Sequence, residues 1–321
     1  MIAQQSLIDK LSLRFARIAA LFLGVLFSLA AHADLSEARA AYESGDHSLA
    51  YELTLELAQG GNVDAQKLTG AFYLWGQGVE RDVERAVRWL TKAASHDDPH
   101  AHNLLGDIFW DGKHIAREPS TAIKHYRQAH ALGHQEASLS LAIALSESGD
   151  NTTELAEALT LFKRLAEEGN TQAQFRTGLA YALGYGVEID NGKAKKWYEK
   201  AAKNGHVGAN YQLGDIYALG LGVPIDDVKA VEFYRFSAER GVGLAQLKLG
   251  LSYIYEKGNE YNPGQAYKWL TLATMNTDLA AANTDIDPEQ VKLGAEIARL
   301  GTPPQDRERI KQEIESWQPI E

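Results

Sequence analysis

Histidine is the residue type in this sequence with the clearest capacity for chemistry. Seven of the ten histidines fall within a stretch of 39 residues, namely His96, His100, His102, His114, His125, His130 and His134. Imidazole nitrogens are common ligands of zinc and copper, and His96, His100 and His102 straddle an expected helix junction. The alternative is that these histidines are solvated on turns and outer helix faces, some beside acids such as Asp97 and Asp98. We favour that alternative and expect no metal and no cofactor.

Catalytic motifs are missing from the sequence. It contains no Gly-x-Ser-x-Gly, no Walker A loop, no Ser-x-x-Lys and no His-Glu-x-x-His, which are the patterns that place a nucleophile, a phosphate cradle or a zinc ion. The pairs Gly184-x-Gly186 and Gly220-x-Gly222 follow expected helices rather than strands and carry no lysine. We therefore do not expect an enzyme.

The N-terminal segment has the layout of a secretory signal peptide. A basic region is followed by a run of 13 apolar residues, 18–30, and then by the small-residue motif AHA at 31–33. The basic residues are Lys10, Arg14 and Arg17. The apolar run is shorter than the ~20 residues of a membrane span, although an uncleaved anchor is the alternative. We expect residues 1–33 to be removed, leaving an exported, periplasmic protein without integral membrane association.

Charge and cysteine content limit the partners. The formal net charge is −11, and residues 34–321 carry 29 basic and 42 acidic residues. Such a chain is repelled by phosphate backbones, so nucleic acid is not an expected partner. With no cysteine there is neither a lipobox nor a disulfide framework, and stability must come from packing.

The chain repeats itself every 36 residues. The decapeptide YALGYGVEID at 181–190 returns as YALGLGVPID at 217–226. Alanines keep the same step at Ala65, Ala101, Ala137, Ala173, Ala209 and Ala245. A glycine series keeps the same 36-residue step at Gly70, Gly106, Gly178, Gly214 and Gly250. In the third repeat Ala142 takes the place of the glycine. Six registers in agreement predict a repeat architecture.

Each repeat reads as a helix hairpin. In one of them, residues 173–183 have small and apolar residues at spacings of three and four, and Gly184 is suited to end the helix. Asp190 lies where a second helix needs an N-cap, and that helix runs to Gly205. A single hairpin cannot bury both faces, so we predict an all-α fold: a right-handed α-solenoid of stacked hairpins.

A glycine in the middle of each first helix costs about 1 kcal/mol of helix propensity relative to alanine, so it must serve packing. We expect the glycines and the register alanines to let two helices approach closely. Aromatic side chains would fill the remaining space. In the second helices these are Trp89, Tyr126, Phe162, Tyr198, Tyr234 and Trp269.

This pattern resembles the Sel1-like repeat, a relative of the tetratricopeptide repeat. The motif is Ala-x(4)-Gly-x-x-Tyr-x-x-Gly-x-Gly-Val-x-x-Asp-x(3)-Ala, followed by an aromatic residue and Ala-Ala. We expect six repeats in residues 64–280, a degenerate N-terminal hairpin in 34–63 and capping helices in 281–321. The turns of repeats two, three and six depart from the motif, and the third reads SESGDNTTE at 146–154.

The resemblance implies a protein or peptide partner, held in a concave groove lined by the first helices. The groove positions of tetratricopeptide repeats lie two, six and nine residues after the register alanine. Of the residues at those positions we expect six to contact the partner: Asn103, Asp107, Trp110, Phe175, Tyr211 and Asp215. Aromatic residues are common interface anchors, and carboxylates favour a basic segment. The alternative is that the aromatic residues pack between repeats and the carboxylates are merely solvated.

The resemblance implies a scaffold or adaptor, and the export signal suggests a cell-envelope complex. Three alternatives remain: an envelope hydrolase, since some cysteine-rich relatives are described as β-lactamase-like; a histidine-rich metal-binding protein; and a purely structural spacer.

Overall fold

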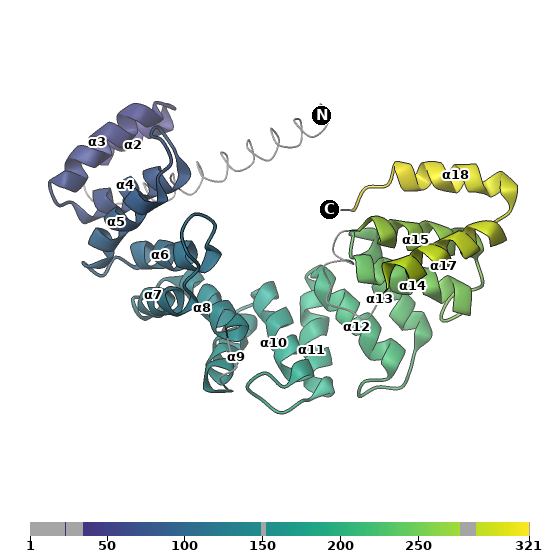
Figure 1. Cartoon of the computed structure of the whole chain (residues 1–321). Coiled ribbons are helices and arrows are strands. Elements are labelled where there is room, and N and C mark those ends of the chain that lie inside the picture. Colours follow the sequence, from purple (N-terminus) through teal and green to yellow (C-terminus); the bar gives the residue numbers. More distant parts are fainter. Residues whose placement is uncertain (1–22, 24–34, 149–151, 277–286, 321) are drawn as a thin grey trace. The chain divides into compact units, whose positions relative to one another are not determined.

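The structure, a computed structural model, describes residues 23, 35–148, 152–276 and 287–320. Outside these ranges lie almost all of the predicted signal peptide and residues 277–286. The described residues contain sixteen helices and no strand, as the sequence predicts (Figure 1). In chain order the helices are α2 Ser36–Glu43, α3 His47–Gln59, α4 Val63–Trp75, α5 Val83–Ala94, α6 Pro99–Asp111, α7 Pro119–Ala131, α8 Gln135–Glu147, α9 Thr152–Glu167, α10 Thr171–Leu183, α11 Asn191–Lys203, α12 Val207–Leu219, α13 Asp227–Glu239, α14 Gly243–Tyr255, α15 Pro263–Met275, α17 Pro288–Gly301 and α18 Pro304–Glu315.

A side chain at the same repeat position starts most of the first helices. Asn62, Asp98 and Asn170 accept a hydrogen bond from the backbone N–H three residues later, at 2.7–2.9 Å. That donor is in each case the register alanine, which is fully buried. The cap satisfies one of the four N–H groups that a helix start leaves open, typically contributing about 1 kcal/mol. The alanine register therefore records both helix initiation and packing.

The two glycines of the hairpin turn have different roles. The first ends the helix in the left-handed conformation, with φ of 77° at Gly184. The second lets the turn touch the preceding repeat, because a Cβ at Gly186 would lie 2.4 Å from the backbone nitrogen of Ala156. Gly78 and Gly258 lie equally close to the start of the preceding second helix. In repeat six, where the first glycine is missing, Glu256 takes the left-handed conformation with φ of 55°.

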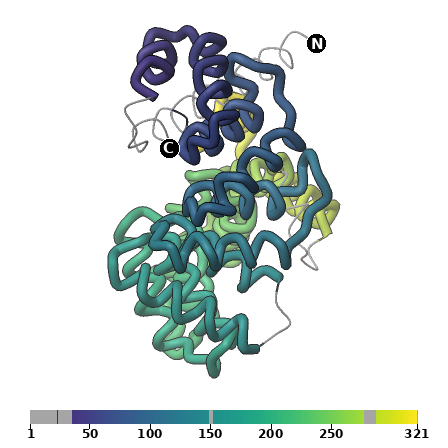
Figure 2. The backbone as a smooth tube through the Cα atoms, turned by 90° about the vertical axis from the view of Figure 1, so that its left-hand side faces the viewer, coloured from purple at the N-terminus to yellow at the C-terminus, as the bar shows by residue number. Residues whose placement is uncertain are grey.

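The chain divides into two compact units, residues 1–150 and 151–321. The boundary falls in the third predicted repeat, where both turn glycines are missing. In the first unit α2 and α3 form an N-terminal hairpin against α4, and consecutive helices then pack in order through α8. Its core includes Tyr42, Leu68 and Phe72, of which Leu68 and Phe72 are fully buried. The smooth tube in Figure 2 shows the up-and-down course of successive helices.

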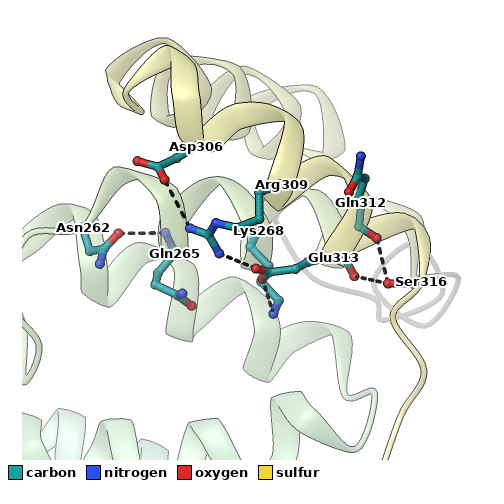
Figure 3. A network of polar contacts seen from close by, with 8 residues as sticks. All are labelled: Asn262, Gln265, Lys268, Asp306, Arg309, Gln312, Glu313 and Ser316. Carbon is teal, nitrogen blue, oxygen red and sulfur yellow. Dashed lines mark hydrogen bonds and ion pairs between the residues drawn. The ribbon is translucent and has the colours of Figure 1, made fainter.

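The second unit contains α9 to α18 and ends in two capping helices. As predicted, Asp287 caps α17, and Pro288 occupies the first turn of this helix, which ends at Gly301. Helix α17 packs on α15, and α18 also contacts α15. Figure 3 shows one polar contact between α15 and α18, an ion pair of 3.1 Å between Lys268 Nζ and Glu313 Oε2.

Candidate functional site

The middle of each first helix lies directly against the second helix of its own hairpin. A Cβ on Gly106, Gly178 or Gly214 would lie 2.5–2.6 Å from the ring of a tyrosine twenty residues later. In the first and last repeats Leu90 and Leu270 take this position. In these two repeats the residue against the glycine is therefore not aromatic, and Trp89 and Trp269, one position earlier, pack in the hydrophobic core as the aromatic series predicts. The close approach explains why glycine is kept despite its poor helix propensity.

Two of these tyrosines hold a carboxylate on the first helix. The Tyr126 hydroxyl donates to Asp107 Oδ1 at 2.9 Å, and the Tyr234 hydroxyl donates to Asp215 Oδ1 at 2.7 Å. Burial, and then the neighbouring aspartate, raise the pKa of both tyrosines, so the hydroxyls remain protonated donors. Tyr198 occupies the same position, but Leu179 replaces the aspartate. The Tyr198 hydroxyl is buried and has no hydrogen-bond partner among the described residues.

In the first unit the three expected partner-binding residues lie along α6. Asn103 Nδ2 donates to Asp107 Oδ2 at 3.3 Å. Asp107 is open to solvent on one side, while the surrounding protein displaces water from its other sides and raises its pKa to about 6; the Tyr126 hydrogen bond opposes this rise. Trp110 lies under the Arg117 guanidinium, 4.4 Å from the ring centroid. Arg117 Nε also donates to the Trp110 carbonyl oxygen at 3.0 Å.

In the second unit the expected residues are half-buried. Phe175 stacks on His206, with ring centroids 4.3 Å apart, and contacts the Tyr198 ring. Tyr211 lies 6.0 Å from the Tyr234 ring, and burial followed by Asp215 raises its pKa. The structure thus brings Tyr211 and Asp215 together, and it also gives Phe175 and Tyr211 packing contacts. Neither Asp107 nor Asp215 forms an ion pair with another described residue.

The histidine cluster is arranged differently from the solvated one that we favoured. Only His96 and His114 are exposed among its seven members. His102 Nδ1 lies 3.0 Å from His125 Nδ1, and burial, followed by His102, lowers the pKa of His125 to about 4. Four of the imidazoles lie in two pairs, His102 with His125 and His100 with His134, which spacing along the sequence does not show.

One histidine pair belongs to the helix-capping system. His134 occupies the cap position of α8, where Nδ1 accepts from the Ala137 N–H at 3.3 Å, and Nε2 therefore donates to His100 Nδ1 at 2.9 Å. His206 caps α12 in the same way and donates to Gln172 at 3.2 Å. Burial lowers the pKa of both capping histidines. Both histidines therefore act as neutral helix caps. In the described ranges, no group of three or more His, Asp or Glu side chains is suited to bind a metal.

A buried charge network is the feature that sequence reasoning missed. Lys67 is only 2% exposed, and its Nζ lies 2.9 Å from Asp64 and 3.1 Å from Asp98. Its repeat position corresponds to Asn103 and Tyr211, so the sequence predicted a groove residue there. The paired carboxylates instead hold the ammonium inside the first unit, where a lone charge would be unfavourable. The i,i+3 spacing of Asp64 and Lys67 was the one available signal.

The fold and the repeat geometry define the class of protein: an all-α protein built from stacked helix hairpins, in which mid-helix glycines let the two helices approach closely. The Sel1 repeat family matches residues 63–98, 99–134, 171–206, 207–242 and 243–278, more than half of the chain. The chain therefore belongs to the Sel1 repeat family. The match omits residues 135–170, which hold the third predicted repeat and the boundary between the units.

Known proteins with this repeat resemble the chain over much of its length. A Sel1 repeat protein from Oxalobacter formigenes is 29% identical with a TM-score of 0.62, covering 80% of this chain and all of that one. A protective antigen of uropathogenic Escherichia coli with an SLR fold is 25% identical with a TM-score of 0.59, covering 83% of this chain and 59% of that one. The mouse protein sel-1 homolog 2 is 28% identical over 156 residues, 45% of this chain. The chain covers less than a quarter of that relative's length.

No helix among the described residues is long and apolar enough to cross a membrane.

Proposed function

We propose that this protein is an adaptor that binds basic segments of other proteins on its first helices, with one such site in each of its two units. Sel1 repeats mediate interactions between proteins, and the chain contains five of them. The observation that supports a basic partner is the pair of carboxylates at equivalent positions, Asp107 and Asp215. Each is oriented by a tyrosine hydroxyl and lacks a cation among the described residues.

The tyrosine hydrogen bond prepares the carboxylate for binding. It fixes one oxygen, so the side chain loses little further freedom when a lysine or arginine reaches the other. Carboxylates on a binding surface contribute mainly to specificity and association rate. Trp110 and Tyr211, three residues after Asp107 and four before Asp215, supply the apolar contact area that such sites use as anchors.

The proposal includes export, on the sequence evidence of the basic and apolar segments before residue 34. A cell-envelope complex is the setting that this export supports. Cell fractionation with an antibody to the chain tests it directly. Recovery of a shortened protein in the periplasmic fraction is expected, and recovery of a full-length protein in the cytoplasm would contradict it.

Charge-removing substitutions test the binding face. D107N/D215N keeps the size of both side chains and leaves an oxygen to accept from each tyrosine. Immobilised protein is used to capture partners from envelope extracts, and we expect the double variant to lose the partner that the wild type retains. E84Q/E232Q makes the same charge change on exposed second-helix positions and serves as the control. If both double variants lose the partner equally, or if neither loses it, the assignment of Asp107 and Asp215 to partner binding is refuted.

The aromatic anchors need a separate test because they also pack. W110A/Y211A should weaken capture of the same partner while lowering the melting temperature only slightly. A variant that unfolds would assign the two side chains to the core instead.

A further inference from the structure

The second unit carries a row of exposed apolar side chains along its hairpin turns. Two positions per turn take part, and both keep the 36-residue step. We define the apolar turn edge as Leu183, Ile189, Leu219, Ile225, Tyr255 and Tyr261. Their exposed fractions lie between 52% and 66%. Large side chains of this kind are rarely left in water in a row, and such a patch commonly marks an interaction site.

Folding of the turn does not require these residues. At the position of Ile189 and Ile225, the first unit has Arg81 and Arg117. In both units the aliphatic part of the side chain packs over the helix-ending glycine: a Cβ on Gly76 would meet the Arg81 Cβ at 3.2 Å, and one on Gly184 the Ile189 Cγ1 at 3.1 Å. Arginine therefore fulfils the same packing role with a charged end. The apolar end is a property of the second unit.

The three turns are neighbours in space. A Cβ on Gly222 would lie 3.4 Å from Asn191, next to the first turn, and one on Gly258 would lie 2.1 Å from the Asp227 carbonyl oxygen, next to the second. The turns that carry the six apolar side chains therefore follow one another along one edge of the second unit.

Charge around this edge indicates its partner. The three turns, taken with the first residues of the helices that follow them (183–193, 219–229 and 255–265), contain six carboxylates and three lysines. Two of the lysines, Lys193 and Lys229, are already paired with the helix-capping Asp190 and Asp226. The remaining acids form no ion pair among the described residues: Glu188, Asp227, Glu256 and Glu260. An acidic border repels an anionic lipid surface and attracts a segment with basic flanks.

We propose that the apolar turn edge binds an amphipathic segment of a partner protein, apolar along one face and bordered by lysine or arginine. This surface is separate from the first-helix face and extends the proposed function by a second contact region. Leu183, Ile189, Leu219 and Ile225 would bury apolar area against the segment, and the acidic border would set its orientation.

The test uses a synthetic helical peptide of about 18 residues, five helical turns, with leucines on one face and lysines elsewhere. A matched peptide has glutamates in place of the lysines. Binding to the full chain is followed by fluorescence anisotropy at about 0.15 M salt. We expect the lysine peptide to bind at least about tenfold more tightly than the glutamate peptide.

I189R/I225R copies the residues that the first unit carries at this position, so it should fold, which circular dichroism verifies. It should weaken binding of the lysine peptide by about tenfold or more. L49R/L132R is the control, because it adds the same charge at two exposed leucines of the first unit. We expect it to change binding by less than about twofold. Equal effects of both double variants would show a mere response to net charge and overturn the proposal.

Two further outcomes separate this surface from the alternatives. Binding of the chain to phosphatidylglycerol vesicles that is lost in I189R/I225R would overturn the proposal in favour of a membrane contact. D107N/D215N should leave binding at the turn edge unchanged, so failure of the first-helix proposal and failure of this one remain distinguishable. If D107N/D215N abolishes peptide binding while I189R/I225R does not, the turn edge is not the site.

Discussion

Replacing Tyr126, Tyr198 and Tyr234 by phenylalanine would remove one oxygen atom from three side chains at the same repeat position. All three are at most 4% exposed, and all three rings lie against a mid-helix glycine. They differ in the partner of the hydroxyl. Two donate to Asp107 or Asp215, and the third has no partner among the described residues. The series therefore compares one chemical change in three nearly identical settings.

The expected effects have opposite signs. A hydrogen bond to a charged group contributes about 1.5–3 kcal/mol. Since the carboxylates can still meet water on their open side, we expect Y126F and Y234F to lower the unfolding free energy by about 1.5 kcal/mol, the lower end of that range. A buried hydroxyl without a partner costs about 1–3 kcal/mol. Y198F should therefore leave stability unchanged or raise it by about 1 kcal/mol.

Urea denaturation, followed by circular dichroism and by hydrogen exchange within each repeat, measures the three differences. L179D provides a second check, because it places at Tyr198 the carboxylate that the other two tyrosines have. A double-mutant cycle of L179D and Y198F should give a favourable coupling of about 1–2 kcal/mol. Equal destabilisation by all three phenylalanine substitutions, or no coupling in the cycle, would refute the reasoning.

Two more predictions concern buried charge and pH. Burial lowers the pKa of His206 below its usual 6.5, so the unfolded chain takes up the proton first and stability falls as the pH drops below about 6.5. The variant H206N, which copies Asn170, should keep the helix cap and make this loss of stability smaller in denaturation curves between pH 7.5 and 5. An unchanged loss would contradict the cap assignment. K67M should lower the unfolding free energy by about 3–5 kcal/mol, because Asp64 and Asp98 would lose their shared cation, whereas a loss below about 1 kcal/mol would show that the network is solvated.

The hairpins were predictable because their signals are local. Asp190 and Gly184 act on the backbone within one turn of their own position, so a single sequence contains the information. The predicted cap and helix end agree with the structure. The 36-residue step added a second constraint, since an error in one repeat would have conflicted with the others.

Side-chain pairing was less predictable because it depends on rotation about the helix axis. One residue changes the direction of a side chain by about 100°, which is why Leu90 lies against Gly70 while Trp89 packs elsewhere on the core. Lys67 shares its repeat position with Asn103, yet its charge is satisfied inside the unit by Asp98, 31 residues away. Spacing gives the position of such a residue, and the neighbouring repeat determines its environment.

Specificity in this protein must reside where the repeats differ. The positions that repeat are committed to backbone geometry, because caps, mid-helix glycines and turn glycines each satisfy a local steric or hydrogen-bonding requirement. At the variable positions the same backbone accepts Asp107 or Leu179, and Arg117 or Ile225, without a change in the hairpin. Each exchange alters charge or apolar area on the surface and leaves packing nearly constant, so binding preferences can change independently of the fold. The two units, built on one frame, can for that reason present different chemistry to their partners.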